Sequence, residues 1–170
     1  ARVQPGDLVV AGVETVVFND PSFIQGTWRE ILKVFDPAKM VVVFDHRVPA
    51  NNRESAAAHC TGRAFAKRFG IERVHDVGYD QGIAQVLVAN YGYALPGTVL
   101  VCADSHTGAA GAFNCAARGI GVPDVILAAT TGKTWFEVGP TLRYELEGKL
   151  KPGVLTKDVF LHISAEYGDH

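Results

Sequence analysis

Short apolar, β-branched runs alternate with helical stretches along this chain, and this alternation limits the folds open to it. Two of the runs, Met40–Phe44 and Thr98–Ala103, are almost wholly apolar. Runs of this kind are typical of strands that are buried on both faces of a parallel sheet. Because helical patterns separate the strands, we predict an α/β fold: a layered α/β/α domain with a mostly parallel sheet.

Hydrophobic periodicity and helix-stop signals assign the remaining segments. We expect strands at Leu8–Phe18, 40–44, Arg73–Val77 and 98–103, and a hairpin-like pair at Trp135–Val138 and Leu142–Leu146. We expect helices at Phe23–Val34, Arg53–Phe69, Ile83–Asn90, Ala110–Arg118, Pro123–Thr131 and Thr156–Tyr167. No repeat or linker interrupts the pattern, so we expect residues 1–170 to form a single domain.

Composition and charge exclude several classes of protein. The 170 residues are 48% hydrophobic and 20% charged, as in a globular domain. The formal net charge is −2 and the basic residues do not cluster, so we expect neither nucleic acid nor a membrane surface as a partner. No apolar stretch approaches the roughly 18 residues of a transmembrane helix, and the first residues lack a secretory signal. We expect a cytoplasmic protein, or one of an organellar matrix in a eukaryote.

The cysteines do not suggest a disulfide framework or a metal site. Cys60, Cys102 and Cys115 are an odd number and have no CxxC spacing. Disulfide-rich domains and cysteine metal sites both favour closely paired cysteines. We therefore expect three reduced thiols that pack as small hydrophobic groups, and no metal ligands in this chain.

Acid–histidine motifs follow both of the buried runs. Asp45-His46 comes after the first run, and Asp104-Ser105-His106-Thr107 comes after the second. Parallel strands end at one edge of their sheet, where ligand-binding and catalytic groups gather. A carboxylate beside an imidazole sets its orientation and pKa, as proton transfer requires. The sequence therefore predicts a site for proton-transfer chemistry at this edge.

Both motifs also have a purely structural interpretation. Asp45 could cap the next segment while His46 bonds the backbone, and Ser105 or Thr107 could cap the helix that follows. In the functional interpretation, small residues at 108–112 let a ligand approach, and the helix N-terminus favours a carboxylate or phosphate. The residues alone leave both interpretations open. The other internal histidines are expected to be packing or surface residues: His59, His75 and His162.

Seven motifs, in order from Val43 to Trp135, carry a resemblance to a known family that runs from about Val3 to Tyr167. They are Val43-Phe44-Asp45-His46-Arg47-Val48-Pro49, Asp76-Val77-Gly78, Leu95-Pro96-Gly97, Ala103-Asp104-Ser105-His106-Thr107, Gly111-Ala112-Phe113, Gly119-Ile120-Gly121 and Ala129-Thr130-Thr131-Gly132-Lys133-Thr134-Trp135. On these motifs the chain resembles the aconitase family, and within it the large subunits of 3-isopropylmalate dehydratase and homoaconitase. The resemblance covers an N-terminal portion, so we expect a fragment of a longer large subunit.

The resemblance implies a [4Fe-4S] hydro-lyase that acts on a hydroxy di- or tricarboxylic acid, typically in leucine biosynthesis. Its partner would be a small swivelling subunit or domain. The catalytic residues would be Asp45, His46, Asp104 and His106, with Asp45 and His46 protonating the departing hydroxyl. The substrate and cluster pocket would be lined by Ser105, Thr107, Gln85, Asn19 and Asp20. The family's cluster cysteines would lie beyond His170, and its catalytic serine in another domain or subunit, so this chain alone should be inactive and hold no cluster.

Three positions depart from the family pattern. Gln85 stands where the family usually has histidine, Asn19 where it has histidine or glutamine, and Ala109 where it has threonine or asparagine. Glutamine can form hydrogen bonds but cannot shuttle a proton. Three functions therefore stay open: a 3-isopropylmalate dehydratase type of enzyme, a dehydratase for another substituted malate, maleate or homoaconitate, and a non-catalytic domain for binding or assembly.

Overall fold

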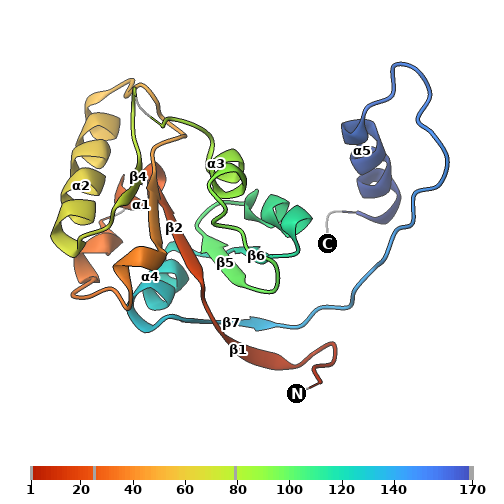
Figure 1. The fold of residues 1–170 in the computed structure, drawn as a ribbon, viewed down its shortest axis with the longest axis horizontal. Helices are drawn as coiled ribbons and strands as arrows, with labels where there is room; N and C mark the ends of the chain where they lie inside the picture. The colour runs from red at the N-terminus through yellow and green to blue at the C-terminus, as the bar shows by residue number, and fades with distance from the viewer. Residues whose placement is uncertain (1, 25, 79, 169–170) are drawn as a thin grey trace. The chain divides into compact units, whose positions relative to one another are not determined.

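The computed structural model describes residues 2–24, 26–78 and 80–168. Contacts divide the chain into two compact units, Ala1–Val138 and Gly139–His170. The first unit contains both sheets (Figure 1). The second contains α5 (Thr156–Tyr167), whose bounds agree with the predicted helix. The expectation of a single domain stays a prediction.

Five parallel strands form the main sheet, in the order β4-β3-β2-β5-β6. They are β2 (Thr15–Asn19), β3 (Met40–Val43), β4 (Arg73–His75), β5 (Val99–Cys102) and β6 (Ala116–Gly119). The chain adds β3 and β4 on one side of β2 and then places β5 and β6 on the other. This reversal creates a topological switch point beside β2, the place where open α/β sheets bind their ligands. The predicted α/β fold with a mostly parallel sheet is confirmed.

Helices cover both faces of this sheet, because the strand side chains alternate between two apolar clusters. One cluster joins Met40 and Val42 of β3 to α1 (Asp20–Ile24), α2 (Arg53–Phe69) and α4 (Val122–Thr131). The other cluster joins Val41 and Val43 to α3 (Ala84–Asn90) and the 3₁₀ helix η3 (Thr107–Phe113). Figure 1 shows α2 and α3 on opposite sides of the strands. The result is the predicted three-layer arrangement.

Helix α2 follows its sequence signals closely. The side chain of Asn52 accepts a hydrogen bond from the N–H of Ser55 at 2.8 Å and caps the first turn. Gly70, with φ of 68°, ends the helix in the left-handed conformation. Gly62 is required by packing, because a Cβ there would come within 2.7 Å of the Phe44 ring. The predicted bounds of this helix are therefore confirmed.

The first third of the chain differs from its prediction in two places. The expected strand Leu8–Phe18 is two strands, β1 (Leu8–Gly12) and β2, and β1 pairs antiparallel with β7 (Lys133–Glu137) in a separate sheet. The expected helix Phe23–Val34 is wrong. Its span holds only the end of α1 and the 3₁₀ helix η1 (Thr27–Glu30), and a second 3₁₀ helix, η2 (Pro37–Lys39), follows beyond it. Gly26, with φ of 75°, interrupts the helical path between α1 and η1.

The last third contains two further corrections. The expected helix Ala110–Arg118 is wrong, because η3 ends at Asn114, where φ is 57°, and the chain continues into β6. The expected hairpin is also wrong. Trp135 lies in β7, whose partner is β1, and Leu142–Leu146 forms no strand. Helix α4 agrees with its prediction. Within the described residues, no helix is long and apolar enough to cross a membrane.

Candidate active site

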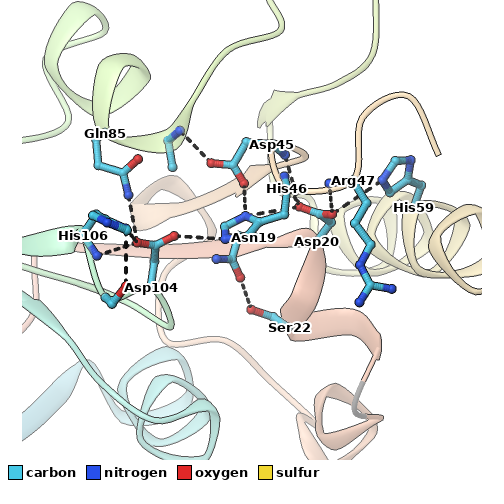
Figure 2. Close-up of polar contacts among 12 residues, drawn as sticks. Asn19, Asp20, Ser22, Asp45, His46, Arg47, His59, Gln85, Asp104 and His106 are labelled. Atoms are coloured by element: carbon cyan, nitrogen blue, oxygen red, sulfur yellow. Dashed lines mark hydrogen bonds and ion pairs between the residues drawn. The ribbon is translucent and has the colours of Figure 1, made fainter. Parts of the chain in front are cut away.

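Three neighbouring strands deliver acidic residues to one edge of the sheet. Asp45 and His46 follow β3, and Asp104 follows β5 (Figure 2). Asn19 is the last residue of β2, and Asp20 comes directly after it as the first residue of α1. Because β2 lies between β3 and β5, the two acid–histidine motifs meet across its end. The structure therefore brings the predicted site residues together at the switch point of the sheet.

Asp20 is the buried carboxylate on which the turn after β3 is built. Its side chain is 1% exposed. Its Oδ1 accepts from the N–H groups of Asp45 at 3.1 Å and His46 at 3.0 Å, and its Oδ2 accepts from Arg47 at 3.0 Å. Three backbone N–H groups compensate the loss of water around this charge. Asp20 therefore fixes the backbone that carries His46.

Asp45 orients the imidazole of His46. His46 Nδ1 lies 2.7 Å from Asp45 Oδ1, and Asp45 Oδ2 accepts from the N–H of Ala84 at 2.8 Å. An ionised carboxylate only accepts hydrogen bonds, so Nδ1 carries a proton. The first residue of α3 thereby anchors Asp45, and Asp45 anchors the ring. The His46 side chain itself is 42% exposed and open to a ligand.

Asp104 approaches the opposite edge of the same ring. Its Oδ2 lies 3.3 Å from His46 Nε2. Its Oδ1 accepts from Gln85 Nε2 at 3.0 Å and from the N–H of His106 at 2.7 Å. The imidazole therefore lies between two carboxylates that come from different strands, as Figure 2 shows.

These carboxylates determine the protonation of His46. Burial lowers its pKa, but the hydrogen bond to Asp45 and the charges of Asp45, Asp20 and Asp104 outweigh that effect, and the pKa is raised above its ordinary value. The imidazolium therefore persists to higher pH than it does in a free histidine. A cation that can release a proton near neutral pH is suited to general acid catalysis.

His106 does not enter the bridge between the carboxylates. Its side chain is 84% exposed, and its Nδ1 lies 3.5 Å from Asp104 Oδ1 and 3.3 Å from Ser105 Oγ. Thr107 is buried, and its hydroxyl donates to the carbonyl of Asp104 at 2.6 Å. Neither predicted cap is made, because η3 begins after His106 without a side-chain cap. An open hollow beside Asp104 and Ser105 is lined also by Arg118.

Two of the three departures from the family pattern, Gln85 and Asn19, have different environments. Gln85 occupies the family's histidine position and donates its hydrogen bond to Asp104. Asn19 is fully buried, and its Oδ1 accepts from Ser22 Oγ at 2.8 Å. Its Nδ2 has no hydrogen-bond partner among the described residues. Gln85 thus joins the polar network, whereas Asn19 lies beneath it (Figure 2).

His59 belongs to this region although the sequence indicates only a packing residue. It is 3% exposed and stacks on Phe44, with ring centroids 4.7 Å apart. Its Nε2 lies 3.8 Å from Asp20 Oδ2. Helical spacing contained the signal, because it places His59 on the buried face of α2 with Ser55 and Gly62.

The residues of this chain do not fit an iron–sulfur cluster. Cys60 is exposed, and Cys102 and Cys115 are buried. Burial, aided by the charges of Asp104 and Asp45, raises the pKa of Cys102 to about 12, whereas cluster ligands are thiolates. A group of side chains that could hold a metal ion also occurs in the described part of the chain, where atoms of Asp20, Asp45 and His46 lie within 4.8 Å of one another. Backbone N–H groups and the His46 imidazole already donate hydrogen bonds to the two carboxylates, which is the arrangement of an acid–base network.

Comparisons with known proteins agree with the motifs. The model of the aconitase family (aconitate hydratase) matches residues 26–170. The 3-isopropylmalate dehydratase large subunit of Mycolicibacterium smegmatis is 45% identical over 169 residues, which cover 99% of this chain and 40% of that subunit. The 3-isopropylmalate dehydratase large subunit 1 of Methanopyrus kandleri is 40% identical, over 97% of this chain and 40% of its own length.

A third relative carries a different name. The protein named "Probable methanogen homoaconitase large subunit" of Methanothermobacter thermautotrophicus is 38% identical, over 98% of this chain and 40% of its own. The chain thus spans about two fifths of the length of these relatives. The match over most of the chain and the ordered motifs lead to one conclusion: the chain belongs to the aconitase family.

Proposed function

We propose that this chain is part of a hydro-lyase of the 3-isopropylmalate dehydratase type and that it supplies the proton donor of the reaction. The observation that carries the proposal is the His46 imidazole, which lies 2.7 Å from Asp45 and 3.3 Å from Asp104. Its raised pKa and partial exposure are what a general acid requires. The names of the large-subunit relatives support the type of substrate.

Dehydration needs such a donor because hydroxide is a poor leaving group. When the C–O bond breaks, its electron pair stays on oxygen, and the proton from His46 turns that oxygen into water. A base takes the proton from the neighbouring carbon, and the C–H electrons form the double bond. We assign the base to another domain or subunit, in agreement with the family pattern. Hydration reverses each transfer.

The geometry supports one of the two nitrogens of His46 as the one that gives up its proton. Nδ1 faces Asp45 at 2.7 Å, and Asp45 is itself held by the N–H of Ala84. Nε2 faces Asp104 at the longer distance of 3.3 Å. We therefore assign the transferred proton to Nε2, with Asp45 keeping the ring oriented throughout. Asp104 orients the other edge and is held in turn by Gln85.

The cofactor and the partner belong to the same proposal. Since the cysteines of this chain do not fit a cluster, we assign the ligands of a [4Fe-4S] group to the part of the subunit outside these residues. The designation of the relatives as large subunits supports a small-subunit partner. We place the enzyme in leucine biosynthesis, in the cytoplasm or an organellar matrix.

A dehydratase for homoaconitate is the second candidate. The methanogen relative with 38% identity favours it, and so do the altered residues around the site, Asn19, Gln85 and Ala109. An intact network argues for catalysis in either case, because Gln85 still forms a hydrogen bond with Asp104.

The test uses the full-length large subunit, purified with its small subunit without oxygen and supplied with iron and sulfide. We expect 3-isopropylmalate to yield an unsaturated acid, measured by ultraviolet absorbance, with homoaconitate as the competing substrate. His46→Gln should lower turnover about 10²–10⁴-fold while the iron and sulfide content stays unchanged. A fully loaded wild-type complex that converts no hydroxy di- or tricarboxylic acid would overturn the proposal.

A further inference from the structure

His59 is a buried imidazole that the proton-donor network does not use directly. Its Nε2 is buried and has no hydrogen-bond partner among the described residues. An unpaired polar atom is unfavourable there, because burial removes its hydrogen bonds to water. The nearest carboxylate oxygen is Asp20 Oδ2, at 3.8 Å. A buried polar atom aimed at a buried charge calls for a role beyond packing.

Asp20 has unused acceptor capacity on the side that faces His59. Its Oδ1 accepts two backbone hydrogen bonds, from Asp45 and His46, whereas its Oδ2 accepts one, from Arg47. A carboxylate oxygen can accept more than one hydrogen bond. His59 thus presents a ring nitrogen to the oxygen with the fewer donors. From this geometry we infer that His59 is a positioning residue for His46, acting through Asp20.

The other charged groups around His59 are already paired with one another. Asp76, which follows β4, accepts from Arg63 Nε at 2.6 Å and from Arg63 Nη2 at 2.8 Å. Arg63 lies one turn after His59 on α2, and its guanidinium lies 5.5 Å from the centre of the Phe44 ring. Asp20 is thus the carboxylate near His59 that has no cationic side chain at hydrogen-bonding distance. It is the group that His59 can steady.

The consequence for His46 follows from a competing contact. His46 Nδ1 lies 2.7 Å from Asp45 Oδ1 but also 3.8 Å from Asp20 Oδ1. While His59 holds Asp20 in place, the Asp20 carboxylate keeps its hydrogen bonds to the N–H groups of the turn. The His46 ring then keeps its hydrogen bond to Asp45. Without His59, Asp20 is free to tilt toward Nδ1 and to loosen the Asp45–His46 pair. His59 thereby preserves the direction in which Nε2 points.

The test replaces His59 in the full-length complex with two complementary side chains. His59→Phe keeps a ring against Phe44 but removes the N–H donor, whereas His59→Gln keeps a donor but removes the ring. We expect His59→Phe to lower kcat about tenfold, as small misplacements of catalytic groups do, with KM within twofold of the wild type. The alkaline limb of the pH profile of kcat should move to lower pH in His59→Phe. His59→Gln should restore most of the kcat value and most of the position of this limb.

His75→Phe is the matched control, because His75 is also buried but has partners at both ring nitrogens. It should lower stability and leave the pH profile of kcat unchanged. Equal losses in His59→Phe and His59→Gln would reduce His59 to a packing residue and overturn the inference. A pH profile of kcat in His59→Phe that matches that of the wild type would also overturn the inference. If His59→Phe does not fold, a tenfold loss in folded His59→Gln without a shifted profile also overturns it.

The inference rests on the proposed function only where it is tested by kcat, by KM and by the pH profile of kcat. The titration of His46, followed by NMR with labelled histidine, needs no turnover. A complex that is inactive on every hydroxy acid would end the proposed function. An unchanged His46 titration in a folded His59→Phe variant would end the positioning role.

Discussion

The two acid–histidine motifs follow equivalent strand ends, yet their histidines have different environments. His46, after β3, has a carboxylate at each ring nitrogen and is 42% exposed. His106, after β5, is 84% exposed. The difference lies in the acids. Asp45 holds its own neighbour's ring, whereas Asp104 holds the backbone N–H of His106 and turns its other oxygen toward His46.

The comparison teaches that the second motif completes the first. Asp104 contributes a carboxylate to a histidine that lies across β2 in space and far away in sequence. The residues of a motif identify the chemical groups. The hydrogen-bond acceptors around each imidazole determine which of the two histidines is suited to act as the acid. Four experiments test whether the two motifs differ in this way.

The largest effect is expected from exchanging the two histidines for glutamine, one at a time. Removing a general acid costs about 10²–10⁴-fold in rate, so His46→Gln should lower kcat of the full-length complex by this factor. His106→Gln should have a much smaller effect, because its ring lies outside the bridge. Steady-state kinetics at matched iron content measures both. Equal losses in the two variants would remove the distinction.

The next effect concerns the support beneath His46. Asp20→Ala leaves three backbone N–H groups of the 45–47 turn without their acceptor. We expect the free energy of unfolding to fall by about 3 kcal/mol or more, measured by denaturant titration. Asp36→Ala is the control, because among the described residues its partly buried carboxylate accepts one hydrogen bond, from the N–H of Ala38, and a lost cap costs about 1 kcal/mol. A similar loss in both variants would contradict the central role of Asp20.

A smaller effect should come from displacing the second motif. A Cβ at Gly119 would collide with the backbone carbonyl of Asp104. Gly119→Ala should therefore cost about 2 kcal/mol of stability and lower kcat. Gly108→Ala, close to the same turn, meets no atom within 4 Å and should change neither quantity appreciably. Thermal unfolding and kinetics together measure the difference. A neutral Gly119→Ala would show that the position of Asp104 is not critical.

The smallest effect is a change in titration. Asp45→Asn removes one cause of the raised His46 pKa, so NMR should find that pKa lower than in the wild type. Because the folded pKa is raised, the contribution of His46 to stability is complete below its unfolded pKa and is lost as pH rises through the folded value. Asp45→Asn should weaken this pH dependence. An unmoved His46 pKa would assign the shift to Asp20 and Asp104 instead.

Much of the fold could be predicted from the sequence, because buried strands and capped helices have local signals. The bounds of α2 follow from Asn52 and Gly70, and the apolar runs mark β3 and β5. The helix expected at Ala110–Arg118 is wrong, since the small residues there fit a 3₁₀ turn and an edge strand as well as a helix. The partner of β7 lies far away in sequence, where periodicity carries no information.

The candidate site shows the same limit. The sequence predicts that Asp45, His46 and Asp104 gather at strand ends. It does not reveal that Asp20 serves the backbone rather than a ligand, because that depends on the direction of three N–H groups. Nor does it separate His46 from His106. Those distinctions arise from tertiary geometry.

The pairing of β1 with β7 has a consequence for the order of folding. Leu8–Gly12 is made before its hydrogen-bonding partner Lys133–Glu137, which follows only after all five strands of the main sheet. Until then the backbone N–H and C=O groups of β1 have no strand partner, the kind of edge on which other chains aggregate. Contacts between distant segments also form slowly. During translation, a nascent chain therefore carries this open edge until the ribbon closes.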